Sequence, residues 1–254
     1  AKKNLIKTYS ANVKDIPPNS NIVFLSVPDD QLILTTKEIS RLKINFSDKL
    51  FIHLSGSENI STLKSLKLKG ASIGSMHIMQ TFPSKHLVEI NKSFAAIESD
   101  NADSSKKIFS IAKSIGLIPF EINSDQKILY HLSGVFASNF LVGNFFEAQK
   151  IFNPMNRQLK INRFLAPIAQ KTLVNILYDG TSKTLSGPIE RGDITTIQHH
   201  LMEMKSKLFY PKDKKLGRLL RLSYVVQSLI LLQTSEEKFG KLSASQKKIQ
   251  KLLS

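Results

Sequence analysis

The sequence predicts an α/β domain with a largely parallel β-sheet, followed by an all-helical domain. Up to residue 122, short β-branched and aromatic runs alternate with stretches of helical apolar spacing, which is typical of βαβ units. From Ser124 onward only the helical spacing remains. We therefore expect a boundary near Ile122, with the α/β domain over residues 1–122 and the helical domain over residues 123–254.

Five short apolar runs are expected to be the strands of the sheet. They cover residues 21–27, 49–56, 70–78, 93–99 and 117–122. The helices expected among them cover residues 30–42, 58–66 and 104–116. The segment "NADSSKK" offers an N-cap for the last of these helices, and Gly116 is suited to end it.

The second half of the chain is expected to fold into helices over residues 124–152, 162–180, 193–207 and 216–233. Ser124 or Asp125 is expected to cap the first helix, and the tail over residues 243–254 is expected to be a helix end or a frayed terminus. Residues 220–233 are apolar around nearly the whole helix, so they require burial on all sides. We expect a homodimer through this domain, and a helix at the centre of a monomeric bundle is the alternative.

Composition excludes several classes of protein. No apolar stretch approaches the ~20 residues that span a bilayer, and we expect no secretory signal in the first residues given. The absence of cysteine excludes disulfides, thiolate metal sites and cysteine nucleophiles, and it suits a cytoplasmic protein. The net charge of +16 can attract phosphate backbones, but only 6 of the 36 basic residues are arginine and the lysines are spread along the chain. A solvated basic surface therefore explains the charge better than a nucleic-acid site.

Polar residues follow three of the predicted strands and indicate a ligand site. The stretches are "VPDD" after the first strand, "HLSGS" at the second and "HIMQTF" at the third. Ligands bind at the carboxyl ends of strands in open parallel sheets. Turn and helix-cap chemistry explains each stretch taken alone, whereas three in succession favour a site.

The predicted helix after Ser124 carries a second group of candidates. Lys127 and His131 are four residues apart and project from one face, where a lysine can give a proton to a carbonyl. Ser138 shares this face to within about forty degrees, and Asn139 lies about a hundred degrees further round. A purely structural role for the Lys127 and His131 pair is equally open. We find no metal-ligand spacing, no G-x-S-x-G and, among eleven glycines, no G-x-G-x-x-G.

Five motifs occur in an order that resembles a known family. They read "FLSVPDDQL", "HLSGS", "GASIGSMHIMQTFP", "YHLSGVFASNFL" and "LSGPIERGD". Over nearly the whole chain they resemble a bacterial Rossmann-like, NADP oxidoreductase-like family whose helical C-terminal part is a domain of unknown function. That family is similar to pyrroline-5-carboxylate reductase, ketopantoate reductase and prephenate dehydrogenase. Ile78 replaces a proline of the family's third motif, whereas His77, Gln80, Thr81 and Phe82 match it.

The resemblance implies an NADP-dependent (or NAD-dependent) oxidoreductase acting on a small carboxylated carbonyl or imine compound, with its site between the two domains. It implies catalytic roles for Lys127, His131 and His77. It implies cofactor contacts for Val27, Pro28, Asp29, Ser55 and Gly56, and substrate contacts for Gln80, Thr81, Ser138, Asn139 and Arg191. Arg191 is equally suited to cap a helix that begins near Asp193.

The family's first strand, glycine fingerprint, helix and second strand have no counterpart in this sequence. We expect that this unit precedes residue 1 in the natural protein rather than that the protein has lost it. A non-catalytic protein that senses a nucleotide or metabolite on the same scaffold is the main alternative, because fold does not imply activity. A basic nucleic-acid-associated protein is a weaker third possibility. The resemblance also predicts that Lys127→Ala lowers turnover more than cofactor affinity.

Overall fold

The computed structural model describes residues 12–84, 86–152, 161–206, 209–210 and 212–254. The chain forms two compact units, which divide between Val142 and Gly143. The predicted boundary near Ile122 falls earlier because the helical chain after that residue packs on the sheet. Tyr130, for example, contacts Phe120 of the last strand with ring centroids 5.8 Å apart.

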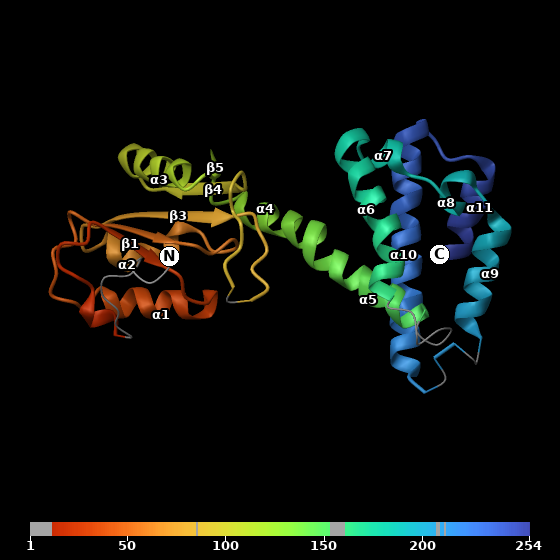
Figure 1. The fold of residues 1–254 in the computed structure, drawn as a ribbon, viewed down its shortest axis with the longest axis horizontal. Helices are drawn as coiled ribbons and strands as arrows, with labels where there is room; N and C mark the ends of the chain where they lie inside the picture. The colour runs from red at the N-terminus through yellow and green to blue at the C-terminus, as the bar shows by residue number, and fades with distance from the viewer. Residues whose placement is uncertain (1–11, 85, 153–160, 207–208, 211) are drawn as a thin grey trace. The chain divides into compact units, whose positions relative to one another are not determined.

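The first unit is built on a five-stranded sheet in the order β1-β2-β3-β4-β5 (Figure 1). The strands are β1 (Ile22–Leu25), β2 (Leu50–His53), β3 (Ser72–Ile78), β4 (Phe94–Ser99) and β5 (Ile118–Glu121). All neighbours are parallel except β3 and β4, which are antiparallel. The predicted fold class is confirmed, and the carboxyl ends of β1, β2 and β3 lie along one edge of the sheet.

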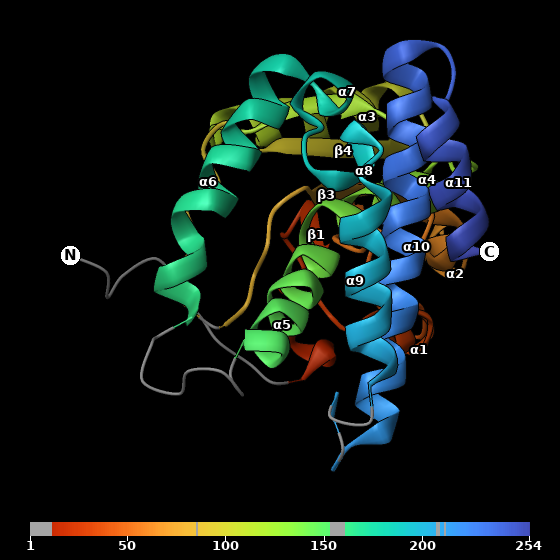
Figure 2. The ribbon, with the colours of Figure 1, turned by 90° about the vertical axis from the view of Figure 1, so that its right-hand side faces the viewer.

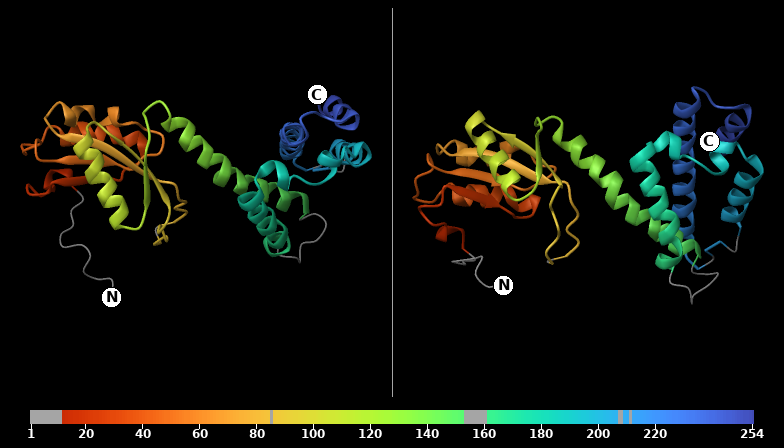
Figure 3. Two further views of the ribbon diagram at one scale, coloured as in Figure 1. Left: turned by 90° about the horizontal axis from the view of Figure 1, so that it is seen from above. Right: turned by 45° about the horizontal axis from the view of Figure 1, so that its top comes forward.

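Helices cover both faces of this sheet (Figures 1 and 3). On one face, α1 (Asp29–Ile39), the 3₁₀ turn η2 (Ile60–Leu63) and α2 (Lys64–Lys67) pack on the sheet. On the other face, α3 (Ala102–Ser114) buries Ile108 and Ala112 against β2, β3 and β4. A short 3₁₀ turn, η1 (Val13–Asp15), precedes β1.

The predicted ends of α3 are confirmed. The Asn101 side chain accepts a hydrogen bond from the backbone N–H of Ser104, which is the usual N-cap bond. Gly116 follows the helix with φ of +84°, a conformation that glycine adopts without strain.

The predicted helix over residues 124–152 is divided into three consecutive segments. They are α4 (Lys127–Gly134), the π-helical segment η3 (Val135–Asn139) and α5 (Phe140–Phe152). The predicted cap at Ser124 or Asp125 is wrong, since Gln126 occupies the N-cap position and no side chain caps the helix. The Ser124 hydroxyl instead donates a hydrogen bond to the buried carboxylate of Glu98.

All regular secondary structure in the described residues of the second unit is helical, as predicted. Its helices are α6 (Ile161–Asp179), α7 (Thr181–Thr184), α8 (Pro188–Arg191), α9 (Ile194–Lys205), α10 (Lys214–Phe239) and α11 (Ala244–Leu253). Figure 2 shows α9, α10 and α11 side by side, and they bury Ile197, Leu232 and Ile249 among them. The tail is an ordered helix, because Ser243 and Gln246 form a capping box at its start. None of the helices in the described ranges has both the length and the apolarity that crossing a membrane requires.

Candidate functional site

A row of buried polar side chains crosses the sheet beneath α4. His53, Ser75 and Glu98 are register neighbours on β2, β3 and β4, so their side chains lie on the same face. The Lys127 ammonium donates a hydrogen bond to the Ser75 hydroxyl (2.6 Å) and lies 3.5 Å from the Glu98 carboxylate. The same carboxylate accepts a hydrogen bond from the backbone N–H of Ile60 (3.2 Å). The buried ion pair therefore joins α4 to β4 and to the chain that follows β2.

Burial dominates the electrostatics of Lys127. It lowers the pKa of Lys127 to about 8, although the nearby Glu98 carboxylate favours the charged form. The residue is 1% exposed, so its ammonium is enclosed by protein.

His53 is a neutral imidazole in the same row. Burial, followed by the positive charge of Lys127, lowers the pKa of His53 to about 3. Neither ring nitrogen forms a hydrogen bond of good geometry with the described residues, although the backbone of Asn59 lies close enough to favour the charged form weakly. The side chain is fully buried, and it lies at the end of β2 just before the Ser55–Gly56 loop.

His77 lies at the carboxyl end of β3 and has a fixed partner. Its Nδ1 is 3.0 Å from the Tyr130 hydroxyl on α4, and its ring centroid is 5.9 Å from that of His131. Burial lowers the pKa of His77 to about 4, and the neighbouring His131 and Lys127 contribute in the same direction. His77 is therefore neutral at physiological pH.

Gly56 brings the loop after β2 against both imidazole rings. A Cβ atom at this position would lie 2.7 Å from Nε2 of His77 and 2.6 Å from Cδ2 of His131. Only glycine allows the backbone to approach these rings so closely. The loop, β3 and α4 thus meet at one place, on the edge where the sequence predicts ligand binding.

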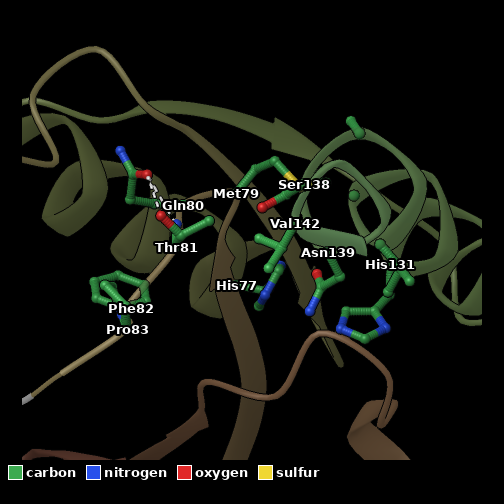
Figure 4. A pocket seen from close by; sticks show the side chains of 13 residues that line it. His77, Met79, Gln80, Thr81, Phe82, Pro83, His131, Ser138, Asn139 and Val142 are labelled. Carbon is green, nitrogen blue, oxygen red and sulfur yellow. Dashed lines mark hydrogen bonds between the residues drawn. The ribbon is translucent and has the colours of Figure 1, made fainter. Parts of the chain in front are cut away.

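A pocket of about 570 Å³ opens beside these rings. Its walls are residues 77 and 79–83, from β3 and the following loop, and residues of α4, η3 and early α5. Figure 4 shows His77, Asn139 and His131 pointing in the same direction, while Gln80 and Thr81 lie on the opposite wall. None of the described residues that line the pocket carries a carboxylate, so its polar groups are imidazoles, amides and hydroxyls.

The π-helical segment determines which side chain lies next to His131 on the helix face that lines the pocket. A π turn accommodates one more residue than an α turn, so the residues after it are shifted by one position around the axis. Asn139 therefore takes the place beside His131 that an uninterrupted helix would give to Ser138. In Figure 4 the Ser138 side chain lies near Met79, away from both imidazoles. The expected alignment of Ser138 with His131 is wrong for this reason, although Ser138 still lines the pocket.

Most of the remaining predicted site residues lie along the same edge. The Thr81 backbone N–H donates to the Gln80 side chain (2.8 Å), and both residues line the pocket. The Ser55 hydroxyl accepts hydrogen bonds within its own loop, from the backbone N–H groups of Ser57 and Glu58. The Ser57 hydroxyl donates to Asp29 at the start of α1 (2.7 Å), which ties the ends of β1 and β2 together.

Three further predicted residues are not among the residues that line the pocket. Lys127 does not line the pocket, because Ser75 and Glu98 enclose its ammonium. Val27 packs against the core beneath α1, next to the exposed Pro28 at the N-cap of that helix. Arg191 is an exposed residue of the second unit, and the cap of the following helix is Asp193, which accepts a hydrogen bond from Thr196. The substrate role predicted for Arg191 stays a prediction.

The pocket lies between the end of β3 and the helical chain after Ile122, and all its lining residues belong to the unit that ends at Val142. The site expected between the two domains stays a prediction.

Sequence reasoning missed Ser75, Glu98 and Tyr130. Ser75 shares the strand face of His77, and Tyr130 lies one turn after Lys127, so both were within reach of the periodicities used. The antiparallel pairing that brings Glu98 to this row has no local sequence signal.

Comparison with known proteins identifies the family. A family profile described as "Domain of unknown function (DUF2520)" matches residues 93–221, just over half of the chain. The chain belongs to the DUF2520 family. The matched region of this DUF2520 protein runs from the start of β4 into α10, and it includes α4, η3 and the helical wall of the pocket.

Solved structures extend the likeness over most of the DUF2520 chain. Protein BF3122 of Bacteroides fragilis, provisionally named an NADP oxidoreductase, matches with a TM-score of 0.71 and 19% identity, over 89% of this chain and 80% of that one. Protein TM1727 of Thermotoga maritima matches with a TM-score of 0.64 and 22% identity, over 85% and 80%. An imine reductase of Myxococcus stipitatus, solved with NADP⁺, matches with a TM-score of 0.55 and 12% identity, over 94% and 83%. These likenesses confirm the Rossmann-like fold with a helical C-terminal part. No curated protein sequence matches the chain.

Proposed function

We propose that this DUF2520 protein is an NADP-dependent oxidoreductase acting on a small carboxylated carbonyl or imine compound. One observation carries the proposal: His77, His131 and Asn139 converge on a pocket at the carboxyl edge of the parallel strands, against the Gly56 loop. This is the edge where open parallel sheets bind ligands. The structurally similar BF3122 and imine reductase carry NADP in their names or in their crystals, which supports the choice of cofactor.

The residues at this edge fit the nicotinamide end of a dinucleotide. The Gly56 backbone packs against the His77 and His131 rings, and the Asp29–Ser57 hydrogen bond holds the ends of β1 and β2 in place. The sequence contains no G-x-G-x-x-G, so the described residues offer contacts to the nicotinamide end and not to the pyrophosphate. When bound, reduced NADP supplies the hydride that is added to the substrate carbon.

The protein's own residues handle the substrate and the proton. His131 lines the pocket, and we assign to it the proton that passes to the carbonyl oxygen or imine nitrogen as the double bond is reduced. The Asn139 amide and the Thr81 hydroxyl suit a carboxylate, and no acidic group on the described walls would repel it. Gln80 holds this wall in place, because its side-chain oxygen accepts the Thr81 backbone N–H.

Lys127 acts in this proposal from beneath the pocket. Its ammonium is one of the charges that lower the pKa of His77, and so helps to keep that imidazole neutral. Lys127→Ala is expected to lower turnover more than cofactor affinity, because the change disturbs His77 and leaves the Gly56 loop unaltered.

The test is a calorimetric titration of the chain with NADPH and, separately, with reduced nicotinamide mononucleotide. The second probe lacks the adenosine half and reports on the nicotinamide end alone. We expect both to bind, and we expect NADPH to be oxidised in the presence of 2-oxo acids or cyclic imino acids. Binding without turnover of any such compound would favour the sensing alternative, and binding of neither probe would refute the proposal.

We also infer that the helical unit pairs with a second copy of the chain. Within the second unit, α10 buries Leu220 and Leu232 but leaves Leu222, Val226 and Ile230 exposed. On α6, Leu177 and Tyr178 are 75% and 86% exposed. Leu222, Val226 and Ile230 are spaced four residues apart and so form an apolar stripe on one face of α10, and exposed apolar surface of this kind marks interaction sites. Light scattering should give the mass of a dimer, and a monomer at high micromolar concentration would contradict the inference.

A further inference from the structure

Tyr130 of α4, which itself packs on Phe120 of β5, holds His77 in a defined orientation. The Tyr130 ring packs edge-on against His77, with centroids 5.5 Å apart, and against Phe120, with centroids 5.8 Å apart. The Tyr130 hydroxyl is 3.0 Å from Nδ1 of His77 and 3.4 Å from the backbone oxygen of the same residue. The imidazole is therefore fixed through its Nδ1 side.

The opposite side of the imidazole faces the Gly56 loop. A side chain at Gly56 would place its Cβ 2.7 Å from Nε2 and 2.9 Å from Cδ2 of His77. His77 also lines the pocket. Since Tyr130 occupies Nδ1, Nε2 is the ring nitrogen left to meet a ligand that enters the pocket beside the loop.

Two arrangements of the protons are compatible with these contacts. In the first, Tyr130 donates to Nδ1, and the neutral ring carries its proton on Nε2. In the second, Nδ1–H donates to the Tyr130 oxygen, whose own proton points to the backbone oxygen of His77 at 3.4 Å. The first arrangement uses the shorter contact for the hydroxyl proton, and the second relies on a contact that is long for an O–H donor.

The charges around the ring support a neutral imidazole with a protonated tyrosine beside it. Burial, followed by the charges of His131 and Lys127 on α4, lowers the pKa of His77 to about 4, and Asp29 of α1 opposes this shift without reversing it. Burial raises the pKa of Tyr130 to about 12, so its hydroxyl keeps its proton. Both members of the pair therefore stay uncharged across the physiological range.

We propose that Tyr130 is a positioning residue that holds His77 in the Nε2–H form, so that His77 offers a neutral hydrogen-bond donor to a carbonyl or carboxylate oxygen in the pocket. The inference deepens the proposed function and rests on it for the identity of the ligand. The proposal gives the two imidazoles different roles. His77 donates a hydrogen bond and keeps its proton, whereas His131 transfers its proton to the substrate.

The experiment measures the tautomer directly. Histidine side chains of the full chain are labelled with ¹⁵N, and the protonation of Nδ1 and Nε2 of His77 is read from their chemical shifts. In the natural protein we expect a bare Nδ1 and a protonated Nε2, and a proton on Nδ1 would overturn the proposal. This measurement needs neither NADPH nor turnover, so its outcome is separate from that of the NADPH titration.

Tyr130→Phe keeps the ring packing and removes only the hydroxyl. We expect a mixture of the two His77 tautomers in this variant, and an unchanged tautomer would overturn the proposal. Oxalate serves as an unreactive mimic of a 2-oxo acid. We expect it to shift the Nε2 signal of the natural protein and to bind about tenfold more weakly to the variant. Absence of any oxalate effect at Nε2 would refute the assignment of this nitrogen to the ligand.

The second unit offers a matched control. Its Tyr224 hydroxyl lies 2.9 Å from Nδ1 of His200, with ring centroids 5.7 Å apart. Tyr224→Phe removes an equivalent hydroxyl and should leave both the His77 tautomer and oxalate binding unchanged. A loss of the Nε2–H form in this variant would show that the effect does not come from Tyr130.

Discussion

Replacement of the buried His53 by leucine should remove a large part of the acid sensitivity of the first unit. His53 is neutral in the folded chain, with a pKa of about 3, whereas an unfolded histidine has a pKa of about 6.5. The unfolded state therefore binds more protons below pH 6.5, and the contribution of His53 to stability falls as the pH falls from 6.5 towards 3.

The size of the effect follows from these two pKa values. At pH 5 the solution is about 1.5 units below the unfolded pKa, and each unit is worth about 1.36 kcal/mol, which gives a loss of about 2 kcal/mol. His77, with a pKa of about 4, loses a similar amount over the same interval in both proteins. His53→Leu also removes ring nitrogens that lack well-formed hydrogen bonds, so at pH 8 the variant should be at least as stable as the natural chain.

The assay is urea-dependent hydrogen exchange at pH 8 and pH 5, read by mass spectrometry on peptides from β2 and β3. These peptides report on the first unit alone. The stability of His53→Leu relative to the natural chain should rise by about 2 kcal/mol between pH 8 and pH 5. His86→Leu, which changes an exposed histidine of the same unit, is the control and should show no such rise. Equal pH dependence in His53→Leu and the natural chain would refute the reasoning.

Three further changes test the site. Gly56→Ala places a methyl group against both imidazole rings, so it should weaken binding of reduced nicotinamide mononucleotide at least tenfold in calorimetry, and unchanged affinity would contradict the role of the loop. Glu98→Gln leaves the Lys127 ammonium buried without its counter-charge and should cost about 3–5 kcal/mol in urea unfolding, of which the double variant with Lys127→Met should recover a part. Asn139→Ala should lower kcat/KM about tenfold and Ser138→Ala much less, because the π segment turns Asn139 towards His131. A larger loss of kcat/KM in Ser138→Ala than in Asn139→Ala would count against this alignment.

A glycine of α5 provides the control for Gly56→Ala. Gly143 has no atom near the position of an added Cβ, so Gly143→Ala should leave nucleotide binding unchanged. It should stabilise the helix by up to about 1 kcal/mol, since alanine is the better helix former.

The sequence predicted correctly those helices and strands that have strong local signals. The alternation of apolar runs and helical spacing predicted all five strands, and Asn101 and Gly116 marked the ends of α3. It failed where a distant partner decides the outcome. Ser124 is a favourable N-cap residue by type, but its hydroxyl donates a hydrogen bond to the Glu98 carboxylate on β4 and does not cap the helix.

The same division holds for the site. The positions of His77, Gln80 and Thr81 followed from the rule that ligands bind at strand ends. The enclosure of Lys127 could not be predicted from the sequence. It depends on the register between β3 and β4, and no local sequence pattern reveals their antiparallel pairing. The π segment likewise had no signal in the spacing of apolar residues, and it exchanged the roles expected for Ser138 and Asn139.

Three contacts between α4 and the β3 segment occur in the same order along both. Lys127 meets Ser75, Tyr130 meets His77 one strand repeat further on, and Gly134 meets Met79 after the next. From Ser75 to Met79, the residue just after β3, the chain advances about 13 Å, and from Lys127 to Gly134 the helix advances about 10 Å, so the three contacts follow one another in the same direction along both elements. A slide of α4 by a single residue, about 1.5 Å, would break all three contacts at once. The buried ion pair at one end therefore sets the position of the pocket wall at the other.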